Sequence, residues 1–490
     1  MLVRPSFAEP PAGRQTLESF LESCRQQAER SRAERYASVS FEGGDLDPLA
    51  ILQQLDRADR LSFYHENTAE DLMIAAIDSV ASFESDCLDR FKAARQFSER
   101  CFENISHWNP RSLPYGNPHL FCGFTFFERD RQGTFPSSTV FLPHWQIVRH
   151  ASGATMVCNA IVRGSTDAAG LARALQSEAD ELMRSPVRVA EATASRERQI
   201  DRHNIARFKA TVAEVLETIA GGTLSKAVLS HAVDLTAPQD FDAISSLQSL
   251  RHRYADCHLF AMGNRWGQRF IGASPERLFA IRQGRLVADA LAGSAPRGAT
   301  PESDAAHAEA LLASPKEMRE HRVVVEFLLD RLRELGIEPE PIAPTRLLQL
   351  SNIQHLWTPI YADLTGLADP EKRVGEADFT DLADFADLAV HPLQLVESLH
   401  PTPAVAGSPQ SVAYREICRH EQFDRLLFAA PLGWFDAAGN ASFLVGIRSA
   451  LLDGARARLY AGAGIVAGSH PDRELAEVEL KLRTTIDSLV

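Results

Sequence analysis

Residues able to do acid, metal or anion chemistry gather near the end of the chain. Glu474, Glu477 and Lys481 are spaced by three and four, so on a helix their side chains share one face. Gly462 and Gly464 precede them in a strand predicted to run into a glycine-rich bend, where backbone N–H groups can approach an anion. Paired carboxylates suit a hard cation such as Mg²⁺. Taken alone, the pattern is more often that of a solvated helix face with an ion pair behind an ordinary turn.

A second pair of carboxylates occurs in Lys316-Glu317-Met318-Arg319-Glu320-His321, within a long helix predicted over residues 304–335. Glu317 and Glu320 lie one turn apart on such a helix. Two acidic helices therefore exist that a fold could bring to one site.

Two further residues are candidates for proton transfer. Lys226 lies in a predicted strand among apolar neighbours, where burial lowers the pKa of an amine toward that of a usable base. A lysine on an exposed strand edge is the ordinary alternative. Glu276 follows a Ser-Pro corner and precedes an apolar run. It is either a turn carboxylate or a buried acid with a raised pKa that donates a proton.

Other polar residues could position a ligand. Arg448 lies in a predicted apolar strand over residues 440–452, so it needs an anionic partner, either a structural carboxylate or a bound one. His355 stands beside a strand, where a histidine is more often structural than functional. A turn of small residues is predicted over residues 291–298.

Composition limits the class of protein. The 490 residues carry a net charge of −14, which argues against non-specific nucleic-acid binding. No apolar run approaches the ~18 residues of a membrane span, and the first residues lack a secretory hydrophobic region. Seven scattered cysteines without a CxxC pair suit a reducing compartment. We expect a cytoplasmic protein that binds neither nucleic acid nor membrane.

The order of predicted elements indicates an α+β fold. Strands dominate residues 118–162, and they recur in pairs between helices later in the chain. Helix-like spacing covers residues 69–105, and a long amphipathic helix is predicted over residues 196–220. We expect residues 1–195 to form an N-terminal α+β region woven into the same fold as a catalytic region at 196–490.

Eight segments, in this order, resemble those of the chorismate-utilising enzymes, which include isochorismate, salicylate and anthranilate synthases. The segments are Leu224-Ser-Lys-Ala-Val-Leu-Ser230, Phe270-Ile-Gly-Ala-Ser-Pro-Glu-Arg277, Leu291-Ala-Gly-Ser-Ala-Pro-Arg-Gly298, Lys316 to His321, Gln354-His-Leu356, Leu399-His-Pro-Thr-Pro-Ala404, Gly446-Ile-Arg448, and 459–481. The resemblance spans residues 200–490. It implies a two-sheet β-sandwich flanked by helices, with chorismate as the substrate.

The resemblance also implies roles for individual residues. Lys226 would be the general base that activates water, and Glu276 the general acid for the departing hydroxyl. Mg²⁺ would be held by Glu320 and Glu477, with Glu317 and Glu474 as ligands through water or as supporting groups. The substrate would contact Gly293, Ser294, His355, Ala404, Arg448, Gly462, Gly464 and Lys481.

Within the family, Ala404 is typical of members that use water, whereas ammonia users and salicylate formers tend to carry threonine there. The resemblance therefore favours a Mg²⁺-dependent isochorismate synthase, an isomerase whose product feeds siderophore, salicylate or menaquinone synthesis. A downstream lyase or synthase is its candidate partner. A salicylate synthase is the first alternative. The second alternative is an NAD(P)-binding oxidoreductase, which is suggested by the loose Gly462-x-Gly464-x-x-x-Gly468 pattern, although no βαβ unit is evident around it. The third alternative is a non-catalytic scaffold.

Overall fold

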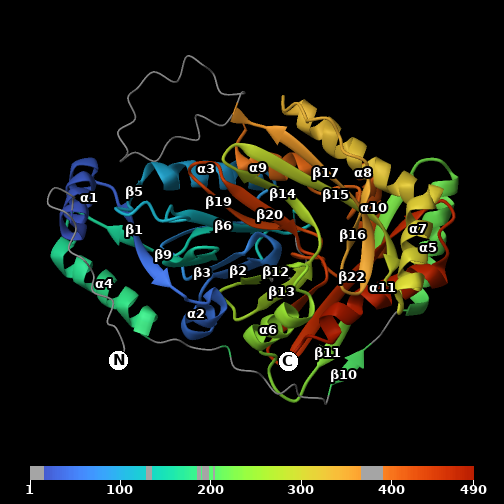
Figure 1. Cartoon of the computed structure of the whole chain (residues 1–490), viewed down its shortest axis with the longest axis horizontal. Coiled ribbons are helices and arrows are strands. Elements are labelled where there is room, and N and C mark those ends of the chain that lie inside the picture. The colour runs from blue at the N-terminus through green and yellow to red at the C-terminus, as the bar shows by residue number, and fades with distance from the viewer. Residues whose placement is uncertain (1–15, 129–134, 185–188, 190–197, 202–204, 366–389) are drawn as a thin grey trace.

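Two β-sheets packed face to face form the centre of the protein, and helices cover both outer sides (Figure 1). The computed structural model describes residues 16–128, 135–184, 189, 198–201, 205–365 and 390–490. The predicted α+β class with two sheets is confirmed. The boundary expected at 195/196 lies outside the described residues.

The larger sheet has 13 described strands, and all its pairs are antiparallel except β1 with β5. Its order is β10 (Gln199–Asp201), β11 (Lys226–Thr236), β22 (Arg456–Val466), β21 (Ser449–Asp453), β13 (Arg269–Ser274), β12 (His258–Gly263), β2 (Ser62–Asn67), β3 (Leu72–Ile77), β8 (Trp145–His150), β9 (Gly153–Val162), β1 (Arg35–Gly44) and β5 (Ile105–Trp108), with β18 (Gly407–Ser408) on β11.

The smaller sheet has nine described strands, all antiparallel. Its order is β16 (Arg346–Gln349), β17 (Ile353–Asp363), β15 (Arg285–Pro296), β14 (Arg277–Arg282), β20 (Ala441–Val445), β19 (Pro431–Asp436), β6 (His119–Phe124), β7 (Ser138–Leu142) and β4 (Ala81–Ser85).

The larger sheet is buried on both faces because its strands alternate side chains between two apolar cores. In β12, Phe260 and Met262 belong to the core between the sheets, whereas Leu259 and Ala261 face the helices. This alternation follows the two-residue period of a strand. The outer core packs against α1 (Leu17–Ser31), α2 (Pro48–Leu55), α4 (Ala168–Arg184), α5 (Ile205–Ala220), α6 (Ala243–Arg253) and α11 (Pro471–Ile486).

The smaller sheet is covered by α3 (Arg90–Glu103), α8 (Pro315–Glu334) and α9 (Pro392–Leu399), whose apolar side chains join the central core. Three further elements complete the described chain: η1 (Thr68–Glu70), α7 (Pro301–Ala313) and α10 (Gln410–His420). No described helix combines the length and the apolar character needed to cross a membrane.

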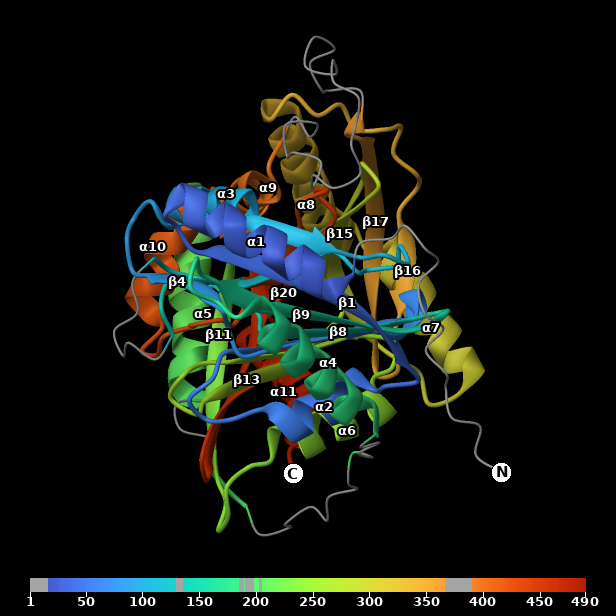
Figure 2. The same ribbon diagram turned by 90° about the vertical axis from the view of Figure 1, so that its left-hand side faces the viewer.

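Each sheet joins a block of early strands, from residues 35–162, to a block of later strands, from residues 199–466. β12 pairs with β2, and β19 pairs with β6, so residues far apart in sequence form single hydrogen-bonded ladders. Figure 2 shows the early strands β1, β8 and β9 in the same stack as β11 and β13.

Several predicted elements are wrong in type or length. Residues 69–105 contain η1, β3 and β4 before α3 begins at Arg90, because alternating apolar positions there belong to strands. The helix predicted from residue 196 begins at Ile205 in the described chain, after β10. The helix predicted over 304–335 is two helices, since Pro315 starts a new helix that Ser314 caps.

Candidate active site

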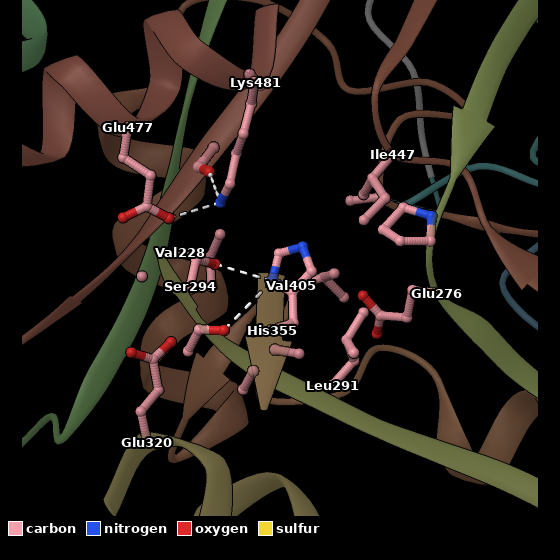
Figure 3. Close-up of a pocket in the computed structure, with 18 of the residues that line it drawn as sticks. Val228, Glu276, Leu291, Ser294, Glu320, His355, Val405, Ile447, Glu477 and Lys481 are labelled. Atoms are coloured by element: carbon pink, nitrogen blue, oxygen red, sulfur yellow. Dashed lines mark hydrogen bonds and ion pairs between the residues drawn. The ribbon is translucent and has the colours of Figure 1, made fainter. Parts of the chain in front are cut away.

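A cavity lies where both sheets meet α8 and α11. Twelve of the fourteen predicted site residues line it: Glu276, Gly293, Ser294, Glu317, Glu320, His355, Ala404, Arg448, Gly462, Gly464, Glu477 and Lys481. In the view of Figure 3, Glu276 lies on the opposite side of His355 from Glu320 and Glu477. The cavity therefore has a charged end beside the helices and a second end at Glu276.

At the charged end, each of the two principal carboxylates is paired with a lysine. Lys226 Nζ lies 2.6 Å from Glu320 Oε1, and Lys481 Nζ lies 2.7 Å from Glu477 Oε1. Burial alone would raise the pKa of Glu320, but the charge and hydrogen bond of Lys226 hold it below its usual value. Lys226 is buried and lies behind Glu320, outside the cavity lining.

Gly464 leaves space for this ion pair beside β22. A Cβ at that position would lie 2.7 Å from Glu320 Oε1 and 3.0 Å from Lys226 Cε, closer than non-bonded atoms tolerate. Glycine therefore leaves space for the ends of these two side chains, which would have to shift if a Cβ were present.

The outer carboxylates share a third lysine. Lys316 Nζ lies 3.4 Å from Glu317 Oε1 and 3.7 Å from Glu474 Oε1, so it bridges α8 and α11. Burial raises the pKa of Glu317 and of Glu474, and the charge of Glu320 adds to the effect at Glu317. Glu474 does not line the cavity but stands behind Lys316.

The glycine-rich segment is a strand and not the predicted bend. β22 runs through both glycines to Val466, with Gly462 opposite Ser230 and Gly464 opposite Val228 in β11. Lys481 donates to Gly462 O (3.0 Å), so the peptide groups of these glycines turn away from β11. The pairing of β22 with β21 ends at Tyr460, which leaves this edge facing the cavity.

Two corners where the chain changes sheet form the other end. Ser274, Pro275 and Glu276 connect β13 to β14, and residues 446–448 connect β20 to β21. The corners bond to one another: Val445 N donates to Glu276 O (3.1 Å) and Ser274 Oγ donates to Val445 O (2.6 Å). Arg448 thus lies between two strands, not inside one as predicted.

Glu276 is buried at its corner, with only 4% of its surface exposed. Burial raises its pKa to about 8, although Lys226 acts in the opposite direction. Its carboxyl group therefore keeps a proton at neutral pH, the state required of a general acid.

The Arg448 guanidinium is buried, and it has no carboxylate partner within the described part of the chain. Its Nη2 donates to His355 Nε2 (2.8 Å), which leaves the Nδ1 hydrogen of His355 for Ser294 Oγ (3.0 Å) or Gly293 O (3.2 Å). Burial, with the charges of Arg448 and Lys481, lowers the pKa of His355 well below its usual range. A neutral histidine thus links the cation to the Gly293-Ser294 bulge.

That bulge replaces a predicted turn. β15 continues to Pro296 and pairs with β17 throughout, with one irregularity at Gly293, where φ is +77°. Glycine tolerates this conformation without strain. The small residues therefore bend a strand locally instead of ending it.

The loop that carries Ala404 is tied to β11 by a buried ion pair. The fully buried Arg425 donates to Val405 O (2.9 Å), to Val228 O (2.7 Å) and to both oxygens of Glu421. The Ala404 wall of the cavity is consequently fixed relative to the strand that holds Lys226.

Residues that the sequence interpretation passed over complete the lining. Lys316 was part of a recognised segment but had no assigned role, although its place beside Glu317 was a signal of shared charge. Phe428 and Ile447 form apolar walls, and nothing in their local sequence distinguishes them from core residues.

Comparison with known proteins identifies the family. The profile described as "Chorismate binding enzyme" matches residues 19–374 and 383–490. This chain is a member of the chorismate-binding enzyme family. The predicted resemblance is confirmed, and the chain is an enzyme of this family, whose members in general use a metal ion.

Curated members of the chorismate-binding family align over most of the chain. The "Salicylate biosynthesis isochorismate synthase" of Pseudomonas aeruginosa is 35% identical over 379 residues, covering 76% of this chain and 74% of the relative. The "Isochorismate synthase MenF" of Bacillus subtilis is 29% identical over 463 residues, covering 92% and 93%.

Solved structures show the same fold. The menaquinone-specific isochorismate synthase MenF of Escherichia coli has a TM-score of 0.69 at 24% identity, covering 95% of this chain and all of that one. Anthranilate synthase component I of Streptococcus pneumoniae has a TM-score of 0.65 at 20% identity, covering 91% and 98%. The predicted chorismate-enzyme fold is therefore confirmed.

Proposed function

We propose that this protein is a Mg²⁺-dependent isochorismate synthase that converts chorismate to isochorismate. The observation that carries the proposal is a single cavity with a protonated carboxyl group, Glu276, at one end and the Lys226–Glu320 pair at the other. Relatives that bear this activity in their names match most of the chain.

The charges in and beside the cavity explain the need for a metal. Four cationic side chains (Lys226, Lys316, Lys481 and Arg448) match four carboxylates (Glu317, Glu320, Glu474 and Glu477), while Glu276 keeps its proton. A doubly negative substrate would leave this balance negative, and a divalent cation restores it. This local balance also resolves how an anion binds to a protein of net charge −14.

The carboxylate set fits Mg²⁺, because hard cations take oxygen ligands and retain water. Glu320 and Glu477 would hold the ion, and Glu317 and Glu474 would support it through water. Glu320 and Glu477 each pair with a lysine, and no three of the four carboxylates come within 4.8 Å of one another in the described chain. The metal must therefore compete with ammonium groups. When bound, it would neutralise the ring carboxylate and polarise the ring for substitution.

The remaining positive groups would bind the second carboxylate of chorismate. Arg448 is a buried cation without a carboxylate partner among the described residues, which is costly unless a ligand supplies one. Lys481 and the N–H edge at Gly462 and Gly464 lie on the same cavity. Ser294 and its partner His355 would contact substrate oxygens between these sites.

Water attack and hydroxyl loss would then be divided between the two ends. Lys226, once released from Glu320 and after giving its own proton to solvent, would accept the proton of the water that bonds to C2. Glu276 gives its proton to the C4 hydroxyl, which leaves as water while the double bonds shift. Acid and base assistance each contribute about 10²–10⁴ in rate. Ala404, held by the Arg425 anchor, would line the path of the water.

Product analysis tests the proposal directly. Pure protein incubated with chorismate and Mg²⁺ should yield isochorismate, with no product when a chelator removes the metal. Salicylate and pyruvate as the only products would assign a salicylate synthase instead. NADH oxidation or reduction, or the absence of turnover, would reject both.

Two further expectations belong to the proposal. All seven cysteines are free thiols, which supports a reducing cytoplasmic location. The product needs an enzyme that consumes it, so a downstream lyase or synthase is the expected partner. Residues 196–490 would supply all of the catalytic groups, with residues 1–195 as part of the supporting sheets.

A further inference from the structure

A second cluster of polar ligands lies far along the larger sheet from the cavity. His144 precedes β8, Cys158 lies in β9, and Glu178 lies in α4. One ligand atom from each lies within 4.8 Å of the other two, the only such trio of His, Cys, Asp or Glu in the described chain. Figure 2 shows α4 in front of β8 and β9.

His144 is oriented as a metal ligand would be. Its Nδ1 contacts the carbonyl of Asn159 (2.9 Å), and a carbonyl only accepts, so Nδ1 carries the hydrogen. Nε2 then faces Glu178 Oε2 at 3.2 Å. On a neutral ring this places two acceptors together, which requires a proton or a cation between them. Metal-binding histidines typically have the opposite nitrogen fixed in this way.

Cys158 supplies the third atom. Its side chain is fully buried on the helix-facing side of the sheet, and no hydrogen bond of its thiol is present in the described chain. The strand pairings with Val39 and Trp145 fix its position on both sides. Sulfur, imidazole nitrogen and carboxylate oxygen together suit a borderline-soft cation such as Zn²⁺ and not Mg²⁺.

The distance between the nitrogen and oxygen ligand atoms fits one edge of a tetrahedral site. Bonds of about 2.0 Å give nitrogen-to-oxygen edges of about 3.3 Å in a tetrahedron, close to the 3.2 Å between His144 and Glu178. Glu178 is half exposed and His144 is partly exposed, so both can adjust toward the buried sulfur. Three protein ligands leave one position for water.

We propose that His144, Cys158 and Glu178 bind one Zn²⁺-class ion, separate from the carboxylates of the active site. Bound there, the ion would fasten α4 to the start of β8 and to β9. The competing interpretation is an imidazolium–carboxylate ion pair beside an uninvolved thiol.

Cobalt titration of the full-length protein in excess Mg²⁺ separates the two. Co²⁺ at this site should give thiolate-to-cobalt charge-transfer absorption at one equivalent, whereas the all-oxygen active site cannot. The Cys158→Ala variant should lose the absorption, and the Glu178→Gln variant should weaken Co²⁺ binding at least tenfold. The matched control Cys101→Ala, a buried cysteine in the other core, should keep it.

A second measurement, of Tm, tests the proposal even if Cys158→Ala fails to fold. Glu178 is half exposed, so Glu178→Gln should fold normally. Zn²⁺ should raise the Tm of the wild-type protein by a few degrees and leave that of Glu178→Gln unchanged, because a ligand stabilises only the state that binds it. No charge-transfer band in folded wild-type protein, or a band that survives in both variants, would overturn the proposal.

Discussion

The two ends of the active-site cavity are built in different ways. At the Glu276 end, two sheet-changing corners are joined by backbone and hydroxyl hydrogen bonds, with Arg448 fixed by His355. At the helix end, long lysine and glutamate side chains pair across α8, α11 and β11. One end is set by the main chain and the other by exchangeable ion pairs.

This difference assigns different tasks to the two ends. A group held by backbone corners keeps its position and its proton before substrate arrives, as electrostatic preorganisation requires. Ion pairs of flexible side chains can instead exchange partners when a cation and an anion enter together. The proposed acid is therefore ready in the free enzyme, whereas the proposed base and metal ligands must first rearrange.

The largest expected effect on turnover comes from a change at the Glu276 end of the cavity. Glu276→Gln keeps the shape and neutrality of the protonated carboxyl group but cannot donate its proton, so turnover should fall about 10²–10⁴-fold. Chromatographic assay of isochorismate measures this, and circular dichroism checks the fold. A variant with near-normal turnover would mean that Glu276 is only structural.

At the exchangeable end, Lys226→Ala should reduce turnover by a similar or slightly smaller factor, about 10²–10³. Because Glu320 then loses its ammonium partner, Mg²⁺ affinity measured by calorimetry should be retained or increased. Loss of Mg²⁺ binding together with turnover would show that the lysine organises the metal site and does not compete for it.

Glu317 and Glu320 of α8 provide a matched pair of carboxylates one turn apart. Glu317→Gln, which changes a group supporting the ion through water, should weaken Mg²⁺ binding about 10–100-fold, and Glu320→Gln, which removes a direct ligand, should weaken it further. Equal effects would remove the distinction between direct and supporting ligands.

A methyl group at Gly464 should push aside the ends of Lys226 and Glu320, and a loss of about 1.4 kcal/mol in transition-state stabilisation would lower kcat/KM roughly tenfold. Gly462→Ala is the comparison on the same strand, since its Cβ would meet Leu229 O and Ser230 Oγ at 3.1 Å and neither member of the Lys226–Glu320 pair. The comparison fails if both variants lose activity equally.

The smallest effect is a pH dependence. With a pKa of about 8, Glu276 should be half ionised near pH 8, so kcat/KM should fall about twofold there and tenfold per unit above it. Between the ordinary value of 4.5 and about 8, the folded state binds the extra proton, so this group's contribution to stability declines as pH rises. Glu276→Gln should lose that slope in calorimetric scans at pH 6 and pH 9.

Local sequence patterns predicted which charged residues share a helix face, but they did not predict the backbone conformations that position the other site residues. Helix spacing placed Glu317 with Glu320 and Glu477 with Lys481 correctly on cavity-facing sides. The same local patterns predicted a bend at Gly462 and Gly464, because glycine frequency does not reveal that the ion pair between β11 and α8 occupies the space beside Gly464. Arg448 was expected inside a strand because the change of sheet depends on β13, which is distant in sequence.

The ion-pair partner of Lys226, the proposed base, could not be predicted from the sequence. The strand pattern left Lys226 either exposed on an edge or buried, and its contact with Glu320 joins residues 94 positions apart. Lys316 was overlooked because its second partner, Glu474, lies on another helix. Sequence patterns report periodicity along one element, whereas these contacts depend on how separate elements meet.

Because early and later strands share both sheets, this enzyme cannot simply be divided into two separately folding fragments. Cutting the chain near residue 200 and expressing the later half alone would uncover the β12 edge that β2 normally occupies and the β19 edge that β6 occupies. Bare edges of this kind invite intermolecular strand addition. We expect fragments to become soluble only when both are co-expressed, which would make the protein a candidate for split-enzyme complementation.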